Sequence, residues 1–215
     1  ANGGNIARVS GNSIINAGSV LFETNGNGGI GLAGAPLRLE VGNLEAVSGS
    51  GGVFFDVGNV NIGGVSEEVI GISTIGGGDI TLESQGDVTV TENISAEIFI
   101  DSETGGDISL TSKTLSVTNG AFISASTFAE GNAGSISITT GFLEVINGAF
   151  IDVSTFGIGN GGSINIMAEN TVVFDRGAAF STLEAEAEVN AGSVSITTGS
   201  ITVTNGVISA STSGK

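Results

Sequence analysis

The sequence predicts an all-β solenoid, a right-handed parallel β-helix of about eight coils, each about 23–30 residues long. Each coil would hold three short strands. Three observations support this fold class. A glycine-led phrase returns at a fixed period, two further phrases alternate apolar with small polar residues, and Asn-Gly turns recur at the same spacing. A period of this size is typical of solenoids, in which each unit buries its apolar face only by stacking on its neighbours.

The first phrase sets the period and supplies one strand of each coil. Gly134-Ser-Ile-Ser-Ile-Thr-Thr-Gly141 returns as Gly192-Ser-Val-Ser-Ile-Thr-Thr-Gly199, and looser copies start at Gly78, Gly106 and Gly162. The phrase therefore recurs about every 28–30 residues. Stacked coils place equivalent side chains above one another. We therefore expect two inward columns, one of Ile80, Ile108, Ile136, Ile164 and Val194, and one of Leu82, Leu110, Ile138, Ile166 and Ile196.

Two further phrases supply the other strands. Both alternate an apolar residue with Ser, Thr or Asn over about five residues, which is the period-2 pattern of a half-buried strand. No segment shows the 3.6-residue apolar spacing of an amphipathic helix. The second phrase stands at 115–120, 143–148 and 201–206, and the third at 123–127, 151–155 and 208–212.

The dipeptide Asn-Gly closes the second phrase at 119–120, 147–148 and 205–206. Both residues tolerate the positive φ that a tight change of direction requires. Asn-Gly is also the strongest two-residue hairpin signal. Because it recurs at the repeat spacing with similar strands on both sides, we interpret it as a stacked asparagine turn, with the hairpin as the alternative.

The chain reads as one domain, 1–215, with irregular coils over 1–77. Regular coils of about 28 residues follow over 78–215. Coil starts near Gly4, Gly29 and Gly52 give the irregular part shorter coils, of about 23–26 residues. We assign 37–41 and 60–62 as second strands of these coils. Arg8 falls where a core aliphatic residue would be expected.

The two ends of the sequence fit one another. Joined end to end, residues 211–215 and 1–6 reproduce the spacing of 154–164 without a gap. We expect coils to continue beyond both ends, either as tandem repeats or through separate subunits that stack. The alternative is an arbitrary boundary between repeats. An open head-to-tail contact that does not close on itself produces a filament.

Composition excludes several function classes. The 22 acidic and 5 basic residues leave a net charge of −17, which argues against nucleic acid and anionic membrane surfaces as partners. No apolar run reaches the roughly 18 residues of a membrane-spanning helix. His, Trp and Tyr are absent, which argues against an enzyme, because general acid–base catalysis most often uses His. The basic residues are too scattered to form a groove for an acidic polysaccharide: Arg8, Arg38, Lys113, Arg176 and Lys215.

Two acidic groups are candidate calcium ligands. Glu184, Glu186 and Glu188 alternate along a short insertion in the longest coil, and calcium takes six to eight oxygen ligands. Asp79 and Asp107 stand one coil apart, about 4.8 Å if stacked. A solvated acidic loop explains the first group, and the aspartate column continues as serine, so we predict no metal, no cofactor and no catalytic residue.

Phenylalanines and threonines form further columns. Phe122 and Phe150 have the parity opposite to the inward isoleucines, so they either form an outward apolar stripe or pack inside at a bulge. Phe128 and Phe156 stack just before a loop, where we expect them to fill a corner. An outward threonine ladder is suggested by Thr139 and Thr197, but too few coils repeat it for an ice-binding face.

Residues 119–128 and 131–140 resemble the repeats of very large filamentous-haemagglutinin-like proteins, notably those of cyanobacteria. Before about residue 76 the chain resembles the broader class of bacterial β-strand-repeat surface proteins, as in Gly51-Gly-Val-Phe-Phe55. The resemblance implies a right-handed parallel β-helix, export across the outer membrane, and service as an adhesin or surface fibre. The Asn-Pro-Asn-type motifs of the family's secretion domain are absent, and the only proline is Pro36.

Together these observations predict a structural component of a bacterial extracellular or cell-surface fibre. It would be built by end-to-end continuation of coils, and eight coils would span about 38 Å. Its partners would be copies of itself or adjoining repeats, with cell-surface or matrix polysaccharide as a further candidate. The alternatives are a stalk segment of a large secreted adhesin whose binding tip lies elsewhere and, more distantly, a polysaccharide-active β-helix enzyme.

Overall fold

The computed structural model describes residues 3–99, 104–183, 190 and 192–212, and within them it contains strands and no helix. All the strands belong to one continuous sheet in which every strand-to-strand ladder is parallel. The strands are β1 (Ile14–Glu23), β2 (Leu37–Ser48), β3 (Val53–Val57), β4 (Val60–Ile62), β5 (Ile72–Thr74), β6 (Ile80–Ser84), β7 (Asp87–Val90), β8 (Ile94–Ser95), β9 (Ile108–Val117), β10 (Phe122–Ser124), β11 (Ile136–Ile146), β12 (Phe150–Asp152), β13 (Ser163–Asp175), β14 (Ala178–Leu183), β15 (Ser193–Thr204) and β16 (Val207–Thr212).

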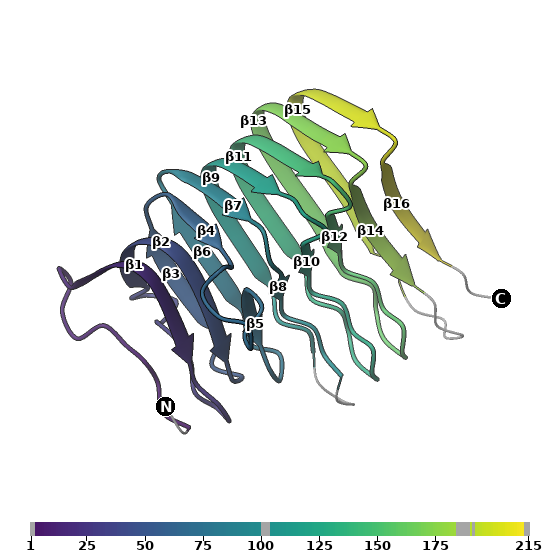
Figure 1. Ribbon diagram of the computed structural model, residues 1–215. Coiled ribbons are helices and arrows are strands. Elements are labelled where there is room, and N and C mark those ends of the chain that lie inside the picture. The colour runs from purple at the N-terminus through teal and green to yellow at the C-terminus, as the bar shows by residue number, and fades with distance from the viewer. Residues whose placement is uncertain (1–2, 100–103, 184–189, 191, 213–215) are drawn as a thin grey trace.

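The chain winds as a β-solenoid, which confirms the predicted fold class (Figure 1). Both predicted aliphatic columns are present, because each member pairs in register with the next. The first column extends back from Ile80 through Val53 and Ile30 to Ile6. The turns of the chain are shortest in sequence between Ile6 and Val53, and the longest runs from Ile164 to Val194.

Three rows of strands make up each regular coil. In the later coils one long strand, such as β11, bends through the first and second rows, and a short strand such as β12 forms the third. Leu115 pairs with Leu143 in the second row, and Ile123 pairs with Ile151 in the third. The three phrases of the sequence therefore correspond to the three rows.

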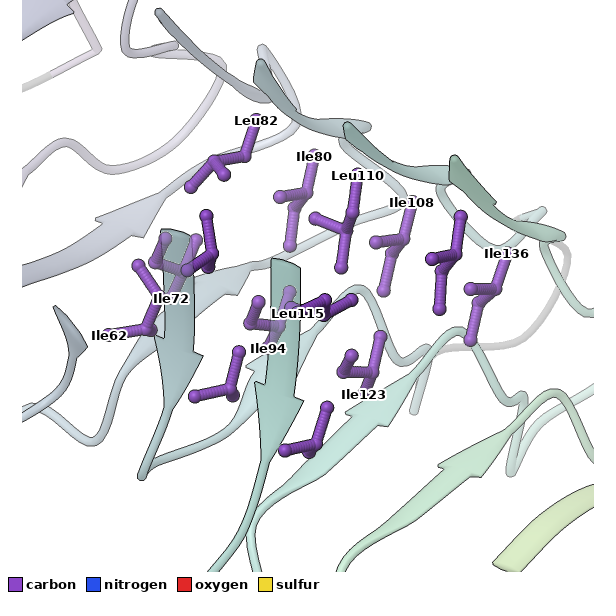
Figure 2. Packing of buried hydrophobic residues seen from close by; sticks show 14 of the residues in the cluster. Ile62, Ile72, Ile80, Leu82, Ile94, Ile108, Leu110, Leu115, Ile123 and Ile136 are labelled. Atoms are coloured by element: carbon purple, nitrogen blue, oxygen red, sulfur yellow. The ribbon is translucent and has the colours of Figure 1, made fainter. Parts of the chain in front are cut away.

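The core is a set of aliphatic columns that face one another across the coil. Figure 2 shows Ile80, Ile108 and Ile136 in one row, with Ile94 and Ile123 in the row from the third strands. All five side chains are essentially inaccessible to solvent. Burial of one such side chain contributes about 1.5–3 kcal/mol. Because the neighbouring coils are what remove these side chains from water, a coil gains this stability only when neighbours cover it.

The Asn-Gly pairs form stacked turns, as predicted, and not hairpins. Asn119, Asn147 and Asn205 have φ of 60°, 57° and 49°, and Arg176 occupies the same place in the intervening coil with φ 55°. The flanking strands pair in parallel with the neighbouring coils and not with one another. Left-handed φ is tolerated by asparagine far better than by most residues, which explains the repeated residue type.

The assignment of 37–41 to the second row is wrong. Leu37 and Leu39 pair with Phe55 and Val57 of β3, so this part of β2 still belongs to the first row. Residues 32–36 fold out as a turn, closed by the Leu32–Ala35 bridge, and the first strand resumes only afterwards. The assignment of 60–62 to the second row is confirmed.

Arg8 lies in a similar excursion, between Ile6 and the start of β1. Its guanidinium donates to the carbonyl of Gly11 across 3.3 Å. Arg8 is therefore not in the aliphatic column, and Ile6 holds that place.

After β10 and after β12 the chain runs outward as a narrow loop and returns, and these two loops lie side by side in Figure 1. Bridges link Ile98, Thr127, Thr155 and Leu183 along this row. A side-chain ladder continues it at the return limb: Asn132 Oδ1 accepts from the backbone N–H of Asn160 across 2.8 Å, and Asn160 Oδ1 from that of Asn190 across 3.1 Å.

Candidate interaction surfaces

The last described coil presents a bare strand edge. β15 and β16 pair with β13 and β14 on one side, and no described strand pairs with their other side. Ile201 and Val203 are 47% and 46% exposed, whereas Val172 and Phe174, which hold the same places one coil earlier, are fully buried. This end of the solenoid therefore shows core residues to solvent.

The described part of this edge carries none of the usual protection. Proteins block exposed strand edges with charged residues, prolines or bulges that prevent pairing with another chain. Residues 193–212 contain no charged residue and no proline. The opposite end resembles it, since β1 carries exposed Ile14 and Ile15 and its only charged residue is Glu23.

Phenylalanine rings stack in two ladders on the outside of the solenoid, one on the third row and one in the loops that follow it. Phe122 and Phe150 lie 5.3 Å apart between centroids, half-buried, while their neighbours Ile123 and Ile151 face the core. The outward orientation is therefore the correct alternative. The stripe is short, because Phe122 pairs with Phe150 and Phe150 with Ala178.

The second ladder contains Phe99, Phe128 and Phe156. Neighbouring centroids lie 4.9 and 4.8 Å apart with interplanar angles of 1° and 6°. These rings are 69%, 45% and 40% exposed, so the prediction that Phe128 and Phe156 fill a corner is wrong. Sequence reasoning missed Phe99 because Glu97 and Ile98 replace the Ser-Thr of the regular phrase.

Between the two ladders lie carboxylates that accept hydrogen bonds from serine hydroxyls. Glu97 accepts from Ser124 across 2.7 Å and from Ser95 across 3.2 Å. In the coils that follow, Asp152 accepts from Ser126 across 3.0 Å and from the hydroxyl of Ser154. These acidic groups are thus part of the stacking between coils.

Asp79 and Asp107 stack as predicted, and their carboxylates accept hydrogen bonds from backbone N–H groups. Each carboxylate accepts the N–H of the residue one coil further on, Asp107 across 2.9 Å and Ser135 across 2.8 Å. Among the described residues there is no group of three or more acidic side chains suited to a metal ion. Glu184, Glu186 and Glu188 lie outside the described residues.

A buried carboxylate that the sequence did not reveal holds the loop between β4 and β5. Glu45 is fully buried and accepts the backbone N–H groups of Val65, across 2.6 Å, and Ser66, across 2.9 Å. From the other side, Glu92 accepts those of Gly64 and Gly71, both across 3.0 Å. Two glutamates from the coils on either side therefore clasp residues 64–71.

The described basic residues do not gather into a groove. Arg38 pairs with Asp56 across 3.1 Å, and Arg176 lies 3.7 Å from Asp175. Lys113 lines an open hollow of about 490 Å³ together with Thr139, Phe142 and Asn170. Lys215 is outside the described residues.

The threonine ladder is interrupted. Thr139 pairs with Met167, which pairs with Thr197. Met167 is exposed, so no flat threonine face extends over these three coils.

No family model, curated protein or solved structure matches the chain. In the part of the chain that the structure describes, no helix is long and apolar enough to cross a membrane. The parallel stacking of the coils by itself identifies a β-solenoid repeat protein.

Proposed function

We propose that this chain is a structural segment of a bacterial extracellular or cell-surface fibre, extended by further β-helix coils that pair with its terminal strands. The observation that carries the proposal is the in-register parallel stacking of the coils, in which the edge of β15 and β16 sets Ile201 and Val203 in the same columns as the buried Val172 and Phe174. A strand edge of this kind is a template for another strand.

The geometry of the interior supports this. Each coil contacts only its neighbours through parallel ladders in register, so an added coil meets the same columns as any internal one. The seven turns from Ile6 to Val194 span about 34 Å at the spacing of strands in a sheet. The added coils belong either to adjoining repeats or to another copy of this chain, in keeping with the resemblance to filamentous-haemagglutinin-like repeats.

Electron microscopy of the purified chain, with the axial repeat measured by fibre diffraction, tests the proposal. We expect filaments with an axial reflection at about 4.8 Å. Val203→Lys, which places a charge on the edge, should leave short rods. The matched control is Thr139→Lys, an exposed position on an internal coil, which should still form filaments.

Filaments that tolerate Val203→Lys would show that the edge is not the contact. Short rods from the unsubstituted chain at every concentration would contradict assembly from separate copies, and would favour the alternative of a stalk segment within a larger adhesin.

A further inference from the structure

A hollow of about 230 Å³ opens beside Phe99, between the coil of β5 and the coil of β8. Phe128, from the following coil, stacks on one face of the Phe99 ring with an interplanar angle of 1°. The hollow lies on the opposite side of the ring, because residues 73–76 of the preceding coil line it. Gly76 has no side chain to cover the ring, which is 69% exposed. The first ring of this ladder therefore offers an aromatic surface to the hollow.

Glu97 supplies a negative charge to the same hollow. Its half-buried carboxylate accepts hydrogen bonds from two neutral hydroxyls, that of Ser124 across 2.7 Å and that of Ser95 across 3.2 Å. An ionised carboxylate accepts about four hydrogen bonds, so acceptor capacity remains. In the part of the chain that the structure describes, the basic residues that form ion pairs are Arg38 and Arg176, and neither pairs with Glu97. The charge of Glu97 thus has no described counter-ion.

The regular repeat does not require an acidic residue at this place. The bridge between Ile98 and Thr127 aligns Glu97 with Ser126, the serine of the regular phrase. That serine joins the coils without a charge, because its hydroxyl accepts the backbone N–H of Ser154, one coil further on, across 2.9 Å. Stacking of the coils therefore does not explain the glutamate, and a positively charged ligand would.

Asp152 extends the acidic feature along the solenoid axis. The hydroxyls of Ser124 and Ser126 lie 3.2 Å apart, and that of Ser126 donates to Asp152 across 3.0 Å, so the two serines connect Glu97 with Asp152. The two carboxylates belong to coils two steps apart, which separates them by about 10 Å along the axis. Both lie between the two phenylalanine ladders, so a chain that joins two positive groups here would run past phenyl rings.

We propose that this surface binds a linear aliphatic polyamine such as spermidine, with one ammonium group in the hollow at Glu97 and Phe99 and another at Asp152. An ammonium group donates three hydrogen bonds, which suits carboxylates with free acceptor sites, and it is attracted to the face of an aromatic ring. The methylene chain suits the aliphatic lining from Ile75 and Ile98. The extended chain of spermidine is long enough to reach both carboxylates, and the net charge of −17 favours the approach of a polycation.

Titration calorimetry of the full, dispersed chain tests the proposal, with spermidine and butylamine as probes. We expect spermidine to bind at one site, at least about tenfold more tightly than the monoamine, because its ammonium groups are tethered. Glu97→Gln and Asp152→Asn should each weaken spermidine binding about fivefold. Phe99→Leu, which keeps the side chain apolar, should weaken it about threefold. Glu83→Gln removes the same charge at an exposed position on the first row and should leave the affinity unchanged.

Several outcomes would overturn the proposal. Equal weakening by Glu83→Gln and Glu97→Gln would mean that spermidine responds only to net charge. Nα-acetyl-lysine amide that binds as tightly as spermidine would mean that a single ammonium group, as in the side chain of a partner protein, is the occupant. If Asp152→Asn lowers the unfolding midpoint, Phe99→Leu decides, because Phe99 is exposed and outside the core; unchanged affinity there would exclude the hollow. None of these measurements depends on filament formation.

Discussion

The backbone N–H of Asp107 donates to Oδ1 of Asp79, one coil earlier, across 2.9 Å. This contact gives the Asp79 carboxylate a backbone hydrogen-bond donor in the stacked pair. Each carboxylate binds an N–H donor of the neighbouring coil, as Asp107 in turn binds that of Ser135. The pair is a device for joining coils.

This leads to a prediction about calcium and Asp107. Asp107→Asn should preserve stability, because the amide oxygen still accepts the N–H of Ser135, whereas Asp107→Ala should lower the free energy of unfolding by about 1 kcal/mol. Urea unfolding with and without a calcium chelator measures both effects. A calcium-dependent midpoint that is lost in Asp107→Asn would instead establish a metal site.

A second prediction concerns the buried Glu45. Glu45→Gln replaces one acceptor oxygen by an NH₂ group that faces the N–H donors of Val65 and Ser66. Leaving such donors unpaired costs about 1–3 kcal/mol. Hydrogen exchange should show faster exchange confined to residues 64–71. Glu83→Gln, at an exposed position, is the control, and equal exchange in both variants would exclude the clasp.

A third prediction compares the core with the edge. Ile136→Ala should lower the free energy of unfolding by about 2–5 kcal/mol, because the side chain is fully buried in its column. Ile201→Ala, at the same kind of residue on the bare edge, should cost below about 1 kcal/mol. Denaturant midpoints of the dispersed chain measure both. A large effect of Ile201→Ala under these conditions would show that the edge is already covered.

A fourth prediction concerns the irregular member of the turn column. Arg176 adopts left-handed φ, which costs an ordinary residue about 1–2 kcal/mol and asparagine less. Arg176→Asn should therefore raise the free energy of unfolding by about 0.5–1 kcal/mol, since the lost ion pair with Asp175 is exposed and weak. Thermal unfolding gives the comparison, and a lower midpoint would mean that the hydrogen bond from the Arg176 guanidinium to the side chain of Asn147 outweighs the backbone strain.

The columns Ile80 to Val194 and Leu82 to Ile196 were predictable from sequence because stacking repeats each environment, and therefore each residue type, at a fixed spacing. The turn at Asn147 was predictable for the same reason. The prediction failed where the chain departs from the repeat. Residues 32–36 interrupt the first strand, so Leu37 was assigned to the second row although it belongs to the first.

The surfaces were harder to predict. The outward rings of Phe128 and Phe156 follow from the path of the loop, which the alternation of residues does not describe. The role of Glu45 could not be predicted from its strand pattern, because its carboxylate accepts hydrogen bonds from a loop that is distant in the sequence. Contacts between non-equivalent positions leave no periodic signal.

The parallel ladders also determine how the molecule bears load. Their hydrogen bonds lie along the solenoid axis, so a pull on the two ends strains the coil interfaces in series, and the weakest one yields first. Between β2 and its followers the ladder is broken into the three short pieces that β3, β4 and β5 provide, whereas β13 and β15 pair almost without interruption. Under tension we expect the coil interface at β2 to separate first, so that the irregular end would open while the regular coils remain paired.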